Sequence, residues 1–159
     1  MKKTIACAAC IVLLAACGKA DGELNPGNWK STMSMEKFEI PGASAEIQAR
    51  ANQMAGQSQS MESCMSAAQA KLGVRDYSKS MQQGDCQMND FTSGGGKMSG
   101  TMSCKSGALG ATALKMEGTY TEDMVEMALA GEVSQPSLPG GKANIAMKIA
   151  SERTGDCAS

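Results

Sequence analysis

The chain contains no histidine, and this absence limits the chemistry that it can perform. Imidazole is the usual general base near neutral pH and the commonest metal ligand among protein side chains. Ordinary hydrolase constellations are therefore disfavoured, and no Ser-Lys or carboxylate pair has the local context that catalysis requires. We expect a non-catalytic protein without a cofactor and assign no catalytic residue. The alternative is an enzyme of unrecognised class.

Aromatic residues, long apolar runs and excess charge are also scarce. One Trp, two Tyr and two Phe serve all 159 residues. The N-terminal apolar run, Ile5–Ala16, has twelve residues, whereas a helix that spans a bilayer needs about 20. Fifteen basic residues stand against sixteen acidic ones, for a net charge of −1. We therefore expect no transmembrane helix and no nucleic-acid partner.

The first 16 residues have the pattern of a signal peptide. Two lysines follow Met1, and the apolar run ends at Leu14-Ala15-Ala16-Cys17. These four residues resemble the lipobox of bacterial lipoprotein precursors, in which the cysteine sulfur receives a diacylglyceryl group and becomes residue one. The sequence thus indicates lipid attachment at Cys17. The alternative is an ordinary signal peptide cut nearby, with Cys17 free.

The expected location is the bacterial envelope, with the protein facing the periplasm and held to the membrane by its N-terminal lipid anchor. Gly18-Lys19 lacks the aspartate of an inner-membrane retention signal, which favours the outer membrane. Residues 1–16 would be removed, residues 17–23 would form a flexible lipidated tether, and residues 24–159 would form one β-rich domain. Nothing in the sequence identifies a protein or small-molecule partner.

The stretch Cys86–Cys104 predicts a β-hairpin closed by its own disulfide. Glycines at 94–96 suit a chain reversal and not a helix. Folding about Gly95 places both cysteines on one face of the pleat, at a separation that a disulfide tolerates. The expected pairs are Cys86 with Cys104, Met88 with Met102, and Asp90 with Gly100. The alternative is two unrelated buried cysteines.

A second disulfide follows from counting. Beyond the signal peptide and Cys17, four cysteines remain in an exported chain, where disulfides are expected. Four cysteines allow three connectivities. Because the hairpin selects Cys86 with Cys104, Cys64 is left to pair with Cys157.

Period-two patterning predicts the other strands. Trp29 is the expected structural anchor of the first strand. Short helices are expected over Ser44–Ala55, with Ile47, Ala51 and Met54 on its apolar face, and over Ser66–Leu72, with a loop at 57–60. The residues expected to face inward are Trp29, Ser31, Met33, Met35, Leu114, Met116, Gly118, Tyr120, Val125, Met127, Leu129, Gly131, Val133, Ile145, Met147 and Ile149. The fold class is mainly β, a single antiparallel meander sheet of about six to seven strands that curls or closes into a barrel, with two short helices and disulfide staples.

The chain has 14 methionines, and their thioethers are soft ligands that suit Cu(I). Methionine also fills core gaps where aromatics are few, and core packing is the favoured interpretation. The alternative is a methionine-based Cu(I) binding or handling protein, with Met33, Met35, Met98 and Met102 as candidate ligands. If they are exposed, better candidates are Met61, Met65, Met81 and Met124.

Three landmarks occur in order along the chain: Leu24-Asn25-Pro26-Gly27-Asn28-Trp29, Cys64-Met65-Ser66 and Arg153-Thr154-Gly155-Asp156-Cys157. Together they resemble domain-of-unknown-function family 3617, a group of small exported proteobacterial proteins, many with Met-rich strands. The resemblance covers Leu24 to Cys157 and implies no activity. We therefore expect a periplasm-facing lipoprotein that acts as a non-catalytic binding or envelope-interaction module.

Overall fold

The computed structural model describes residues 19–80, 85–105 and 111–158. The expected signal peptide, the expected lipid-attachment residue Cys17, and Met81 lie outside the described residues. No helix within the described ranges is long and apolar enough to cross a membrane.

Seven strands and two α-helices make up most of the described chain. In chain order the elements are β1 (Gly27–Glu39), α1 (Ala45–Met54), β2 (Ser58–Met65), α2 (Ala67–Ser80), β3 (Cys86–Gly94), β4 (Lys97–Cys104), β5 (Ala111–Tyr120), β6 (Met124–Ser134), a 3-10 turn η1 (Pro139–Gly141) and β7 (Lys142–Gly155).

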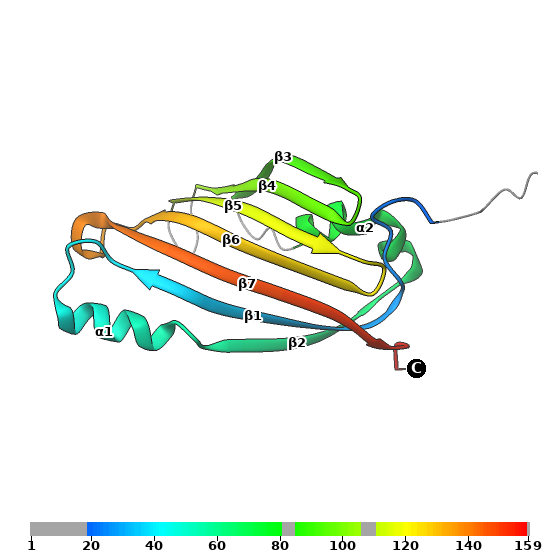
Figure 1. Cartoon of the computed structure of the whole chain (residues 1–159), viewed down its shortest axis with the longest axis horizontal. Helices are drawn as coiled ribbons and strands as arrows, with labels where there is room; N and C mark the ends of the chain where they lie inside the picture. Colours follow the sequence, from blue (N-terminus) through cyan, green and yellow to red (C-terminus); the bar gives the residue numbers. More distant parts are fainter. Residues whose placement is uncertain (1–18, 81–84, 106–110, 159) are drawn as a thin grey trace, which may run out of the picture.

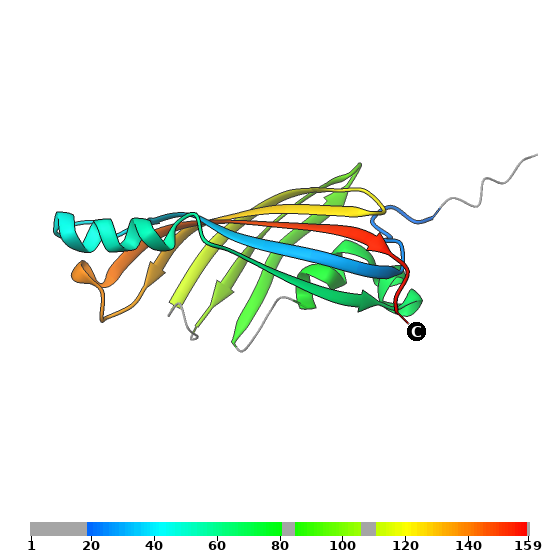
Figure 2. The same ribbon diagram turned by 90° about the horizontal axis from the view of Figure 1, so that it is seen from below.

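All seven strands belong to one antiparallel sheet of order β2-β1-β7-β6-β5-β4-β3 (Figure 1). Strands β3 to β7 form the predicted meander, and the first strand, β1, pairs with the last, β7. The sheet is strongly twisted but does not close, because β2 and β3 remain as its edges (Figure 2). The mainly β class is confirmed, and the structure selects the curled, open form over the barrel.

One face of the sheet, here called the inner face, carries the core. Side chains alternate between buried and exposed along the central strands because successive residues of a strand point to opposite faces. Helix α2 packs on this face, and Tyr77 Oη lies 2.5 Å from Ser151 Oγ of β7. The buried inner-face residues of the three central strands are Leu114, Met116, Tyr120, Val125, Met127, Leu129, Val133, Ala143, Ile145, Met147 and Ile149.

The predicted hairpin is present as β3 and β4. Cys86 lies opposite Cys104 and forms a disulfide with it, and Met88 lies opposite Met102. Both disulfide pairings are confirmed, since Cys64 is bonded to Cys157 with an α-carbon separation of 5.4 Å.

The hairpin differs from the prediction at its tip. The two-residue turn Gly95-Gly96, with φ of 59° and 75°, connects the paired residues Gly94 and Lys97. Two positive φ angles are the geometry that matches hairpin twist. The predicted pairing of Asp90 with Gly100 is wrong, because β3 carries one extra residue between Asn89 and Thr92 and bulges there.

The predictions for residues 44–80 needed three corrections. Ser44 caps α1 through Ile47 N, yet Ile47, predicted on the buried face, is 39% exposed, and only Ala51 is buried there; the Met54 side chain lies outside the described part. Residues 58–60, predicted as loop, belong to β2. Ser66 caps the first stretch of α2, which ends before Gly73 as predicted, since the angles of Gly73 (φ 71°, ψ −167°) are not helical. A second helical stretch, which was not predicted, continues to Ser80.

We predict that the long disulfide stabilises the fold more than the hairpin disulfide. It encloses 93 residues against 18, which corresponds to about 4.5 and about 3 kcal/mol in the chain-entropy model. Urea unfolding of Cys64→Ala/Cys157→Ala and Cys86→Ala/Cys104→Ala should show the larger loss in the first double variant. Equal losses, or an unchanged midpoint in either, would contradict this assignment.

Candidate functional site at the motif end of the sheet

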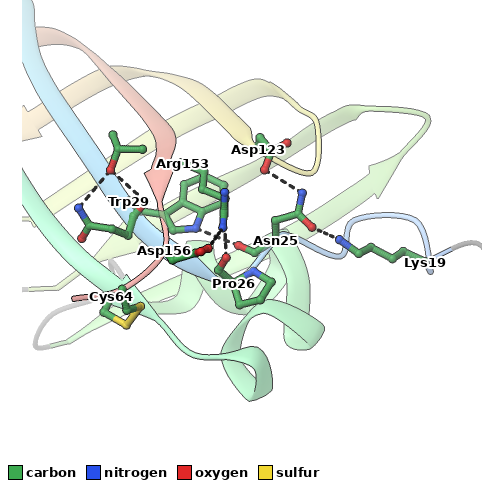
Figure 3. Close-up of polar contacts among 11 residues, drawn as sticks. Lys19, Asn25, Pro26, Trp29, Cys64, Asp123, Arg153 and Asp156 are labelled. Atoms are coloured by element: carbon green, nitrogen blue, oxygen red, sulfur yellow. Dashed lines mark hydrogen bonds and ion pairs between the residues drawn. A yellow bond between two sulfur atoms is a disulfide. The ribbon is translucent and has the colours of Figure 1, made fainter. Parts of the chain in front are cut away.

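The three sequence motifs meet at one end of the sheet, here called the motif end (Figure 3). It comprises residues 24–29, 64–66 and 153–157, together with the preceding segment 19–23 and the β5–β6 turn 121–124. Asn28 of β1 lies opposite both Cys64 of β2 and Gly155 of β7. The Cys64–Cys157 disulfide therefore fastens a point where three strands already lie side by side.

Trp29 occupies the centre of the motif end. Its side chain is 1% exposed, and its indole Nε1 donates a hydrogen bond of 3.0 Å to the carbonyl of Asn25. A buried indole needs such a partner. The ring also lies 6.5 Å from that of Tyr77, in a tilted arrangement. The proline-glycine turn before β1 and helix α2 are thus held to the same side chain.

Arg153 links the two ends of the folded chain. Its Nε donates to the carbonyl of Pro26 at 2.7 Å, and its Nη2 contacts Asp156 Oδ1 at 2.5 Å. Gly27 has φ of 141°, and a β-carbon there would clash with the carbonyl oxygen of Gly155 and lie 2.7 Å from Arg153 Nε. The glycine after the proline is therefore required by the close approach of the β7 backbone as well as by its own backbone angle.

Asn25 connects the N-terminal turn to the β5–β6 turn. Its Nδ2 donates to Asp123 Oδ1 at 2.8 Å, and its backbone N–H donates to the carbonyl of Glu122 at 2.7 Å. Lys19 Nζ bonds to Asn25 Oδ1 and forms an ion pair with Glu122 at 2.9 Å. These contacts lie at the surface, so they fix geometry more than they add stability.

The segment 19–23 packs against the domain, which corrects the prediction of a flexible tether up to residue 23. Asp21 accepts hydrogen bonds from Tyr120 Oη at 2.7 Å and from Gly95 N–H at 2.8 Å. The carbonyl of Gly22 accepts from Val74 N–H at 2.9 Å. The local sequence at Asp21-Gly22 does not predict this packing, because the partner Tyr120 lies 99 residues away in sequence.

The contact between Asp21 and Tyr120 shifts the titration of both groups. The hydrogen bonds from Tyr120 and Gly95 lower the pKa of the Asp21 carboxyl. Burial, and then the hydrogen bond to the Asp21 carboxylate, raise the pKa of Tyr120. Both shifts favour the pair of an ionised carboxylate and a neutral phenol across the neutral range.

The candidate methionine ligands do not form one group. Met98 and Met102 lie on β4, separated from β1 by three strands, and Met98 is only 4% exposed. Met33, predicted to face the core, is 47% exposed. It does lie on the inner face, but that face is uncovered near the β2 edge, so the predicted orientation is right and the predicted burial is wrong. Met35 is half-buried against the core.

The polar side chains of the motif end are engaged in hydrogen bonds and ion pairs within it. In residues 19–80, 85–105 and 111–158, no three or more His, Cys, Asp or Glu are grouped so that they could hold a metal ion. The motif side chains named above bond to one another and to the neighbouring backbone, and the cysteines are oxidised. The motifs therefore define how the strand ends are held together at this end of the sheet.

An open groove of about 740 Å³ lies on the opposite, outer face of the sheet, across β3 to β7. Glu126 and Lys148 form an ion pair of 3.5 Å there, and the hydroxyls of Thr92 and Ser99 are 2.9 Å apart. These polar and charged groups suit a polar partner surface better than an apolar small molecule.

These features define a class of small β domain. It is an open, seven-stranded antiparallel sheet with two disulfides, and the Pro-Gly-x-Trp and Arg-Thr-Gly-Asp-Cys motifs hold its strands together at one end. The family described as "Protein of unknown function (DUF3617)" matches residues 24–157, and the chain belongs to it. No curated protein and no solved structure gave a significant match to the chain.

We predict that Gly73→Ala destabilises the protein more than Gly42→Ala. Both glycines have positive φ, 71° and 79°, so each substitution strains the backbone, and ψ of −167° places Gly73 in a region that is essentially restricted to glycine. Only at Gly73 would the new β-carbon strike the Gly22 backbone, whereas nothing lies within 4 Å of Gly42. Thermal unfolding of the two variants measures the difference. Equal melting temperatures would show that residue 22 does not pack there in solution.

We also predict that Asp21 contributes a pH-dependent part of the stability. Because its folded pKa lies below the ordinary value of 3.8, this contribution is present at neutral pH and is lost as the pH falls through the depressed pKa. Denaturant unfolding of wild type and Asp21→Asn from pH 7 to 2 should show a difference that vanishes in acid. Glu117→Gln, on the outer face, controls for loss of a carboxylate. A difference that stays constant over this range would refute the role of the Asp21 charge.

Proposed function

We propose that the protein is a non-catalytic, lipid-anchored module of the bacterial envelope. Lipid at Cys17 holds it on the periplasmic side, on the outer membrane in preference to the inner, and the domain interacts with another envelope component through its surface.

The observation that carries this proposal is the position of Lys19. The lipobox-like sequence ends at Cys17, and Lys19, two residues later, is already bonded to Asn25 and Glu122 of the motif end. Two residues of extended chain reach about 7 Å. An acylated Cys17 would therefore place the motif end at the membrane surface, with α1 and η1 at the far end of the domain (Figure 1).

The distribution of polar groups supports a binding role over catalysis. The inner face of the central strands is filled by packed apolar side chains, the motif end is internally bonded, and the open groove on the outer face carries charged and hydroxyl groups beside Met98 and Met127. A surface of this kind offers hydrogen bonds and ion pairs to a partner. No nucleophile with an adjacent general base is apparent among the described residues, and the chain has no histidine.

We predict that Cys17→Ser abolishes membrane attachment. Wild-type protein extracted from membranes with detergent should have an intact mass that reports residues 17–159, the added acyl groups and two disulfides. Cys17→Ser should lack the acyl mass and leave the membrane fraction. Cys10→Ser, within the segment expected to be removed, is the matched control and should behave as wild type. An unacylated wild type in the soluble periplasmic fraction would overturn the proposal.

A further inference from the structure

Four methionines form a continuous row on the inner face, across three neighbouring strands. Met147 of β7 lies directly opposite Met35 of β1. Met33 lies two residues before Met35, so both point to the same face. Met61 of β2 lies opposite Ser31, diagonal to Met33. The row therefore runs from β7 through β1 to the β2 edge of the sheet.

The row passes from the core to solvent. Met147 is 8% exposed, Met35 is half-buried, Met33 is 47% exposed and Met61 is 67% exposed. Core packing accounts for Met147 and Met35, as it does for Met116 and Met127, which are each 1% exposed. Packing does not account for Met33 and Met61, whose thioethers are accessible beside one another.

The reach of the side chains allows convergence on one ion. Directly opposed residues of an antiparallel pair have β-carbons about 4.5 to 5.5 Å apart, and diagonal neighbours are about 7 to 8 Å apart, within reach of long side chains. Methionine is unbranched and has three rotatable side-chain bonds, so it adapts to such spacings. Met33 and Met61 are diagonal neighbours and can share one ion. Met35 lies four residues along β1 from Ser31, the residue opposite Met61, and is therefore too far from Met61 to join them.

The ligand chemistry selects the metal. Soft thioether ligands favour Cu(I), whereas Mg²⁺, Ca²⁺ and Mn²⁺ prefer oxygen. The chain has no imidazole, and its four described cysteines are all in disulfides. The thioethers are therefore the soft ligands that the described part of the chain offers to an ion arriving from solvent.

We propose that Met33 and Met61 bind one Cu(I) ion at the β2 edge of the inner face, with Met35 and Met147 behind them toward the core. Binding adds the ion in its reduced form, in exchange for the ligands that delivered it, and changes no oxidation state. The site does not depend on the lipid anchor, so it can be tested whether or not Cys17 is acylated.

The test is anaerobic competition for Cu(I) between the full-length expressed protein, purified from the cell, and the chromogenic chelator bicinchoninate. Leucine has nearly the volume of methionine, so Met→Leu removes the sulfur and preserves packing. We expect one Cu(I) per chain, and at least a tenfold weaker affinity for Met33→Leu and for Met61→Leu. Met124→Leu, which removes a 40% exposed methionine on the outer face, should change the affinity less than twofold.

A second readout identifies the ligands. On Cu(I) addition, the methyl resonances of Met33 and Met61 should shift most, and the affinity should be constant from pH 5 to 8 because thioethers do not titrate there. No competition with the chelator, equal affinity in a Met33→Leu/Met61→Leu double variant, or methyl shifts confined to other methionines would each overturn the site.

Discussion

The structure depends on the pairing of its first strand with its last. Strands β1 and β7 run together from Asn28 to Glu39, and both neighbours of β1 converge at the Cys64–Cys157 disulfide. This contact closes a loop of more than a hundred residues, so the loss of chain entropy on forming it is large. At the motif end, the disulfide, the buried Trp29 and the hydrogen bonds of Arg153 offset this loss. Without this pairing β7, a central strand, would become an edge of the β3–β7 meander, and its motif end would have no cover.

The family signature can be understood through this constraint. Its residues lie far apart in sequence because they belong to the first strand, the second strand and the last strand, which lie side by side in the sheet. Pro26-Gly27 turns the chain onto β1, Trp29 fills the space beneath, and Arg153 binds the turn from β7. The signature thus specifies how the strand ends are held together at the motif end, which is why it carries no indication of a reaction. Surfaces away from the motif end, such as the outer groove and the β2 edge, are free to carry function.

The features that could be predicted from sequence are those with a local pattern. Alternation along β5 to β7 gave their inward faces, and the glycines at 94–96 with flanking cysteines gave the hairpin and, by elimination, the second disulfide. Three features had no local pattern: the pairing of β1 with β7, the docking of Asp21 on Tyr120, and the exposure of Met33. Each depends on which segments cover a face, and a strand's alternation does not contain that information. The bulge at Asp90 was missed because nothing before it breaks the period of two.

The central claim is that segment 19–23 is part of the folded domain, so that the motif end is complete only when this segment is docked. Amide hydrogen exchange of the wild-type protein tests this most directly. The amides of Leu24, Val74 and Gly95 donate to Ala70, Gly22 and Asp21. The account predicts that all three are protected and become exposed together. Exchange of these amides at the rate of an unstructured peptide, while β1 and β7 stay protected, would contradict it.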